Sequence, residues 1–283
     1  MGSTTARLDL LGGFRLQVSG AHPRAAADDL PRGVQRLVAH LGLSHRPARS
    51  AVAGLLWPEV PESQAQGSLR SALWRLQKMA PGVIEVSGGV LALAPAVRVD
   101  VREFDVWAHA SIDPRVDVDR SVLAEVGLSG ELLPGWYDDW VLLERDRLRQ
   151  LRLHALEALA DKLTAVGRHG EALQAAHAAV RAEPLRETAR RALMRIQLAQ
   201  GNVAEALRTY ESFRRYLFDE LGVAPSSQMD DLVAGIRRPR RVPALVSVPS
   251  GGASAAHRTG WTVGSQDVSS GSGRSGHVAR GRQ

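Results

Sequence analysis

The spacing of apolar residues in the first eighty positions predicts two short strands followed by three short helices. Apolar and polar residues alternate on both sides of Gly12-Gly13 in the segment 8–20, which indicates two strands joined by a glycine turn. The segment 31–43 has the helical period, because its apolar residues recur three and four positions apart on one face: Val34, Leu37, Val38 and Leu41. Segments 48–57 and 62–80 predict two further helices, each followed by a proline.

A β-hairpin is predicted directly after the third helix. The apolar runs 83–86 and 90–93 flank Ser87-Gly88-Gly89, and glycine pairs of this kind form the tight turns of hairpins. Three helices followed by a hairpin are the order of a winged helix-turn-helix, here with a small sheet placed before it. The predicted fold is therefore mainly α, with a winged-helix DNA-binding domain in residues 1–102.

Residues 103–236 are rich in alanine and leucine and are predicted to form an all-α, tetratricopeptide-like domain. One face of the first long helix collects apolar residues at spacings of three and four: Leu148, Leu151, Ala155, Leu159 and Leu163. The motifs GRHGEAL and GNVAEAL begin at Gly167 and Gly201, which are 34 residues apart, the period of tetratricopeptide repeats. A further helix is predicted to begin at Pro184. A plain helical bundle is the alternative for this segment.

The predicted helix 62–80 carries a candidate DNA-binding face. Its apolar stripe must turn toward the core: Ala65, Leu69, Ala72, Leu73 and Leu76. The opposite arc has three cations, no acid and several hydrogen-bonding side chains: Gln64, Gly67, Arg70, Ser71, Trp74, Arg75 and Lys78. Arginine bonds bidentately to guanine or to phosphate, and glycine permits close approach of a DNA backbone. An ordinary amphipathic helix with a solvated basic face is the alternative. The hairpin tip has no cation, so we expect it to contact DNA weakly.

The distribution of charge adds more to this picture than the net charge of +6 does. Residues 1–102 carry a net charge of +5, residues 103–236 carry −6 and residues 237–283 carry +7. Basic blocks favour nucleic acid or another charged partner. From Arg237 onward the chain has no apolar periodicity and is rich in Gly, Ser, Arg and Pro, so 237–283 is predicted to be a disordered basic tail. Such a tail is a solvated extension or adds non-specific attraction to phosphates.

No motif predicts catalysis, a cofactor or a metal site. The chain has no cysteine, which excludes disulfides, thiolate zinc sites and cysteine nucleophiles, and it has no phosphate-binding or dinucleotide-binding loop. We interpret Asp138-Asp139 as the acidic start of a helix, beside an aromatic packing cluster formed by Trp136, Tyr137 and Trp140. Without a signal peptide or a long apolar run, the chain is expected to be a cytoplasmic protein that does not bind membranes and is not an enzyme.

Several stretches resemble the Streptomyces antibiotic regulatory protein (SARP) family of transcriptional activators. The most specific are LLPGWYDDWVLLERDRLRQLRLHALEALA at 132–160 and LFDELGVAPSSQMDDL at 217–232. Further matches are LLWPEVPESQAQGSLRSALWRLQKM at 55–79 and VRVDVREFDV at 97–106. The resemblance covers about residues 5–235. It implies an OmpR-type winged helix followed by a bacterial transcriptional activation domain, in the small form of the family that lacks an ATPase domain.

The function implied by this resemblance is sequence-specific binding of double-stranded DNA and recruitment of RNA polymerase at promoters, for example those of a secondary-metabolite gene cluster. The resemblance is also compatible with self-association of the protein on DNA. The chain departs from the family at Gln77, where the family usually has arginine, and in the hairpin, which lacks the usual tyrosine between Gly89 and Leu93. The alternative function is a tetratricopeptide-type protein–protein adaptor with a degenerate winged helix.

Overall fold

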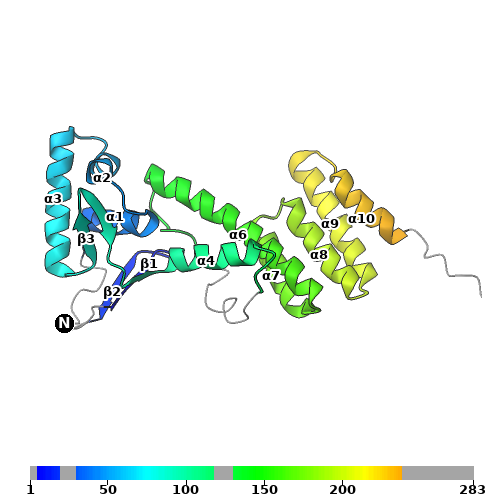
Figure 1. Cartoon of the computed structure of the whole chain (residues 1–283). Helices are drawn as coiled ribbons and strands as arrows, with labels where there is room; N and C mark the ends of the chain where they lie inside the picture. The colour runs from blue at the N-terminus through cyan, green and yellow to red at the C-terminus, as the bar shows by residue number, and fades with distance from the viewer. Residues whose placement is uncertain (1–4, 20–29, 118–129, 238–283) are drawn as a thin grey trace, which may run out of the picture. The chain divides into compact units, whose positions relative to one another are not determined.

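The computed structural model describes residues 5–19, 30–117 and 130–237, which fall within one compact unit and are mainly helical (Figure 1). The predicted fold class is confirmed, since small sheets and three short helices come first and paired helices follow. The predicted basic tail lies outside the described residues, apart from Arg237, which ends the last helix. Within the described part, no helix is long and apolar enough to cross a membrane.

The N-terminal sheet has three strands, one more than the sequence predicts. The two predicted strands, β1 (Thr5–Asp9) and β2 (Arg15–Ser19), are antiparallel and place Leu8 opposite Leu16. A third strand, β5 (Val97–Val99), pairs in parallel with β1, so the strand order is β2-β1-β5. The sheet thereby joins the start of the chain to the segment that follows the hairpin.

The winged helix follows the predicted order closely. Its elements are α1 (Arg32–Leu43), α2 (Arg49–Leu56), α3 (Glu62–Met79), β3 (Ile84–Ser87) and β4 (Val90–Leu93). The strands β3 and β4 form the predicted antiparallel hairpin, and Gly88 and Gly89 at its tip have φ angles of +57° and +79°. Positive φ at both positions of a two-residue loop matches the right-handed twist of the strands it joins. In Figure 1, α3 lies beside β3, with α1 and α2 to its right.

A helix crosses the predicted boundary between the two domains. This helix, α4 (Asp100–Ile112), begins directly after β5 and continues through residue 102. Its first residue, Asp100, accepts hydrogen bonds from the backbone N–H groups of Leu10 and Leu11 at 2.8–3.0 Å. Burial raises the pKa of the Asp100 carboxyl, against the opposing effect of these hydrogen bonds. The division of the chain at residue 102 stays a prediction.

Between residues 139 and 237, the described helices form two antiparallel pairs followed by a single helix (Figure 1). Their bounds are α6 (Asp139–Ala165), α7 (His169–Ala182), α8 (Glu187–Ala199), α9 (Val203–Leu221) and α10 (Ser227–Arg237). The turns between paired helices contain Gly167 and Gly201, with φ of +76° and +78°, a conformation that glycine adopts without strain. The helix predicted to begin at Pro184 begins instead at Glu187, because Pro184 lies in a turn before it.

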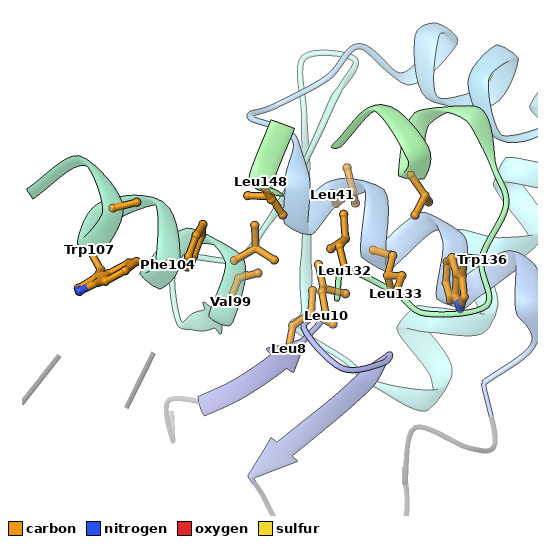
Figure 2. Packing of buried hydrophobic residues seen from close by; sticks show 14 of the residues in the cluster. Leu8, Leu10, Leu41, Val99, Phe104, Trp107, Leu132, Leu133, Trp136 and Leu148 are labelled. Carbon is orange, nitrogen blue, oxygen red and sulfur yellow. The ribbon is translucent and has the colours of Figure 1, made fainter. Parts of the chain in front are cut away.

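One hydrophobic core runs from the N-terminal sheet through α1 and α4 into the start of the helical pairs. Figure 2 shows Leu8 and Leu10 near Leu132 and Leu133, which come from the family-specific LLPGW segment. Backbone hydrogen bonds also cross this junction, from Leu133 N–H to the Leu10 carbonyl at 2.9 Å and from Gly12 N–H to the Glu131 carbonyl at 2.8 Å. Buried side chains of the winged helix and of the helical pairs therefore pack in one core.

Aromatic side chains extend this junction, in part as predicted. Trp136 and Trp140 are buried, and the guanidinium of Arg32 on α1 lies 3.5 Å from the centre of a Trp136 ring. Asp138 precedes α6 and pairs with Arg36 of α1 at 2.5 Å, so this carboxylate has a structural partner. The prediction was wrong for Tyr137, which is 79% exposed although it follows the buried Trp136 in the loop before α6.

Candidate nucleic-acid interface

The structure places the seven predicted site residues together on α3. The apolar stripe is buried as predicted at Ala65, Leu69, Ala72 and Leu76, while Leu73 is half-buried. On the other side of the helix, Gly67 is half-buried and six side chains are exposed: Gln64, Arg70, Ser71, Trp74, Arg75 and Lys78. This arrangement arises because α3 packs one face against α1 and α2 and leaves the other uncovered.

The cations on the exposed face of α3 are not neutralised by neighbouring acids. Among the described residues, Arg70, Arg75 and Lys78 form no ion pair, and the one acid in α3 is Glu62 in its first turn. The arginines of the helical pairs behave differently: Arg186 binds Glu157 at 2.7 Å and Arg147 binds Asp105 at 3.2 Å. The exposed face of α3 therefore keeps a positive potential that can attract phosphates.

A polar depression of about 660 Å³ lies along the N-terminal half of α3. The residues that line it include Gly33 of α1, Trp57 at the end of α2, and Gly67 and Arg70 of α3. A Cβ atom built on Gly67 would have one neighbour within 4 Å, the Nη2 of Arg70 at 3.9 Å. The glycine thus keeps this depression open next to a guanidinium group.

The wing is held beside the N-terminus of α2. Arg49 N–H donates to the Gly89 carbonyl at 2.9 Å, and Leu91 N–H donates to the Pro47 carbonyl at 3.0 Å. This contact brings the side chain of Arg49 to a second depression, which it lines together with Arg70 and Trp74. The sequence analysis missed Arg49, because nothing in the local pattern shows that the hairpin pairs with the segment before α2.

The described residues contain no group of three or more His, Cys, Asp or Glu side chains placed to hold a metal ion. Asp138 and Asp139 lie at the start of α6, as predicted, and Asp138 forms an ion pair with Arg36. The chemistry that the site offers is therefore charge, hydrogen bonding and apolar contact along one helix and the adjoining wing.

Comparisons with known proteins agree with this architecture. Residues 124–237 match the family described as bacterial transcriptional activator domain. Regulatory protein AfsR of Streptomyces coelicolor is 36% identical over 201 residues, which are 66% of this chain and 20% of that protein. Regulatory protein AfsR of Streptomyces griseus is 34% identical over 208 residues, 68% of this chain and 21% of that protein. The chain thus spans about a fifth of the length of these relatives.

A solved structure shares the fold. It is Mycobacterium tuberculosis EmbR in complex with a low affinity phosphopeptide, with a TM-score of 0.63 at 20% sequence identity, over 83% of this chain and 65% of that one. The similar fold, the activator-domain match and the AfsR relatives all agree with the motifs at 132–160 and 217–232. The chain therefore contains a bacterial transcriptional activator domain and is similar to transcriptional regulators of the SARP type.

Proposed function

We propose that this regulator binds specific sites on double-stranded DNA by placing α3 in the major groove. The observation that carries the proposal is the uncovered face of α3, with Arg70, Arg75 and Lys78 unpaired among the described residues. From Gln64 to Lys78 this face is about 21 Å long, at 1.5 Å per residue. The major groove of B-DNA is about 12 Å wide and admits an α-helix of this kind.

Each residue type on this face has a defined use in DNA recognition. Arg70 and Arg75 can bind guanine edges or phosphates bidentately, and Ser71 and Gln64 can hydrogen-bond to bases or to the sugar–phosphate backbone. Gly67 leaves room for close approach of the backbone, and Lys78 supplies a further charge. Arg49, beside the wing tip, extends the cationic surface beyond α3.

The helical part is proposed to contact RNA polymerase and so to activate transcription. The end of α9 and the loop after it expose three apolar side chains, among them Phe218, which is 65% exposed: Phe218, Leu221 and Val223. Exposed apolar patches of this kind mark protein–protein interaction sites. We further propose that it acts at promoters such as those of a secondary-metabolite gene cluster, and that it self-associates on DNA.

Competition binding at several salt concentrations tests the proposal. The full chain is incubated with a labelled duplex selected from a random pool, and scrambled duplex of the same composition serves as competitor. We expect the selected site to resist the competitor, and the logarithm of the binding constant to fall linearly with the logarithm of salt concentration, with a slope of about −0.9 per phosphate contacted. A protein–protein adaptor with a degenerate winged helix would show no preference between the two duplexes.

A further inference from the structure

The depression between α3 and the wing is lined by both apolar and cationic side chains. It has a volume of about 320 Å³, and its lining includes Leu73 and Trp74 of α3 and Ile84 and Val86 of β3. Two of these apolar side chains are largely uncovered, since Trp74 is 65% exposed and Val86 is 54% exposed. The depression is thus an apolar surface within the otherwise polar and cationic face of α3.

The charges beside this depression restrict what can fill it. Arg49 and Arg70 also line it, and neither forms an ion pair among the described residues. Lys78 places its Nζ 5.4 Å from the centre of a Trp74 ring, which adds a third cation at the same side of the helix. An apolar segment of a protein partner would leave these three charges unpaired. A polyanion that carries a small apolar group can pair with the three cations and also place its apolar group against the apolar lining.

In the major groove of DNA, one base substituent is apolar: the C5-methyl group of thymine. We infer that the depression takes the C5-methyl group of a thymine, and that Trp74 is a specificity-determining residue for that base. The inference rests on the proposed function, since it requires α3 to lie in the major groove. Arg70, which lines the same depression, is placed to bind a phosphate or a neighbouring base edge.

Thymine-to-deoxyuridine exchange tests this role, because it removes the methyl group and keeps every hydrogen-bonding atom of the base. The full chain is titrated with the selected duplex and with copies in which a single thymine is replaced by deoxyuridine, one position at a time. We expect at least one position at which the exchange weakens wild-type binding about fourfold, the effect of one buried methyl group. Trp74→Ala should bind the thymine and deoxyuridine duplexes at that position equally well.

Tyr137→Ala is the matched control, because it removes an aromatic side chain that is 79% exposed and lies outside α3 and the wing. It should keep the fourfold difference, and thermal unfolding should show that both variants are folded. If wild type bound the selected duplex and every deoxyuridine copy with equal affinity, the inference would be overturned but DNA binding would stand. The same would follow if Trp74→Ala kept the difference between the thymine and deoxyuridine duplexes. Absence of any preference for the selected duplex over scrambled DNA would overturn the proposed function as well.

Discussion

Arg70 lies between the two depressions beside α3, since it lines both of them. Its side chain is exposed and forms no ion pair among the described residues, so its removal should leave the fold intact. We expect Arg70→Ala to weaken binding to the selected duplex by about 1–3 kcal/mol if it contacts a base edge, as measured by titration at fixed salt. Arg181→Ala is the control, an exposed arginine on α7 whose loss should leave affinity unchanged. Wild-type affinity in Arg70→Ala would remove Arg70 from the interface.

His40 makes the stability of the junction depend on pH. Its half-buried ring on α1 lies edge-on to Trp140 of α6, with ring centroids 5.4 Å apart. Burial lowers the pKa of His40, against a smaller opposing effect of Glu144. The unfolded chain therefore takes up a proton first as the pH falls. The contribution of His40 is present above its ordinary pKa of about 6.5 and is lost as the pH falls from there toward the folded pKa.

Urea unfolding at about pH 8 and about pH 5 measures this effect. We expect wild type to lose more unfolding free energy between these pH values than His40→Phe, which keeps an aromatic ring and cannot be protonated. The pKa of His177 is also lowered, by burial and by Arg181 and Arg190, so part of the pH dependence should remain in the variant. His154→Gln, at an exposed position on α6, should behave like wild type. Equal losses in wild type and His40→Phe would contradict the account.

At the scale of single elements, Gly67 lowers the stability of α3 but keeps the depression along this helix open to DNA. Gly67 lies within the helix, and an added Cβ would meet no backbone of another element, so Gly67→Ala should raise the unfolding free energy by about 0.5–1 kcal/mol. The same methyl group would project into the depression along α3, so affinity for the selected duplex should fall. Gly235→Ala in α10, which also has free space, should give the stability gain without the loss of affinity. Undiminished DNA binding by Gly67→Ala would show that no DNA approaches this turn of α3.

Elements with a long, regular pattern could be predicted from the sequence. The stripe from Ala65 to Leu76 determines both that α3 is a helix and which face it buries, so the exposure of the predicted site residues followed from periodicity alone. The glycine turns at Gly167 and Gly201 could be predicted for a similar reason, because the repeat places them at equivalent positions between paired helices.

Features that depend on distant pairing could not be predicted. The strand β5 has three residues, too few for a pattern, and forms only because β1, about ninety positions earlier, offers it a parallel edge. Arg49 reaches the interface only because the wing pairs with the segment before α2. Tyr137 shares its aromatic character with the buried Trp136, and the sequence does not show which of the two faces inward.

At the scale of the whole described chain, the shared core makes the winged helix and the first helical pair one folding unit. Arg145 of α6 donates hydrogen bonds to the carbonyls of Leu132, Leu133 and Trp136, and so ties the LLPGW segment to α6. We expect the winged helix and the first helical pair to unfold together in one calorimetric transition, with equal calorimetric and van't Hoff enthalpies for it. Trp136→Ala should destabilise that whole transition by about 3–5 kcal/mol. Separate transitions of the winged helix and of the first helical pair, of which the variant moves only one, would contradict a common core.

The central claim, that α3 reads the major groove, is tested most directly by dimethyl sulfate footprinting of the selected duplex. This reagent methylates guanine at N7, which lies in the major groove, and adenine at N3, which lies in the minor groove. We predict that the full chain protects guanine N7 within its site, and that Arg70→Ala reduces this protection at the guanines nearest to Arg70. Protection of adenine N3 without protection of guanine N7, or a guanine pattern unchanged in Arg70→Ala, would contradict the claim.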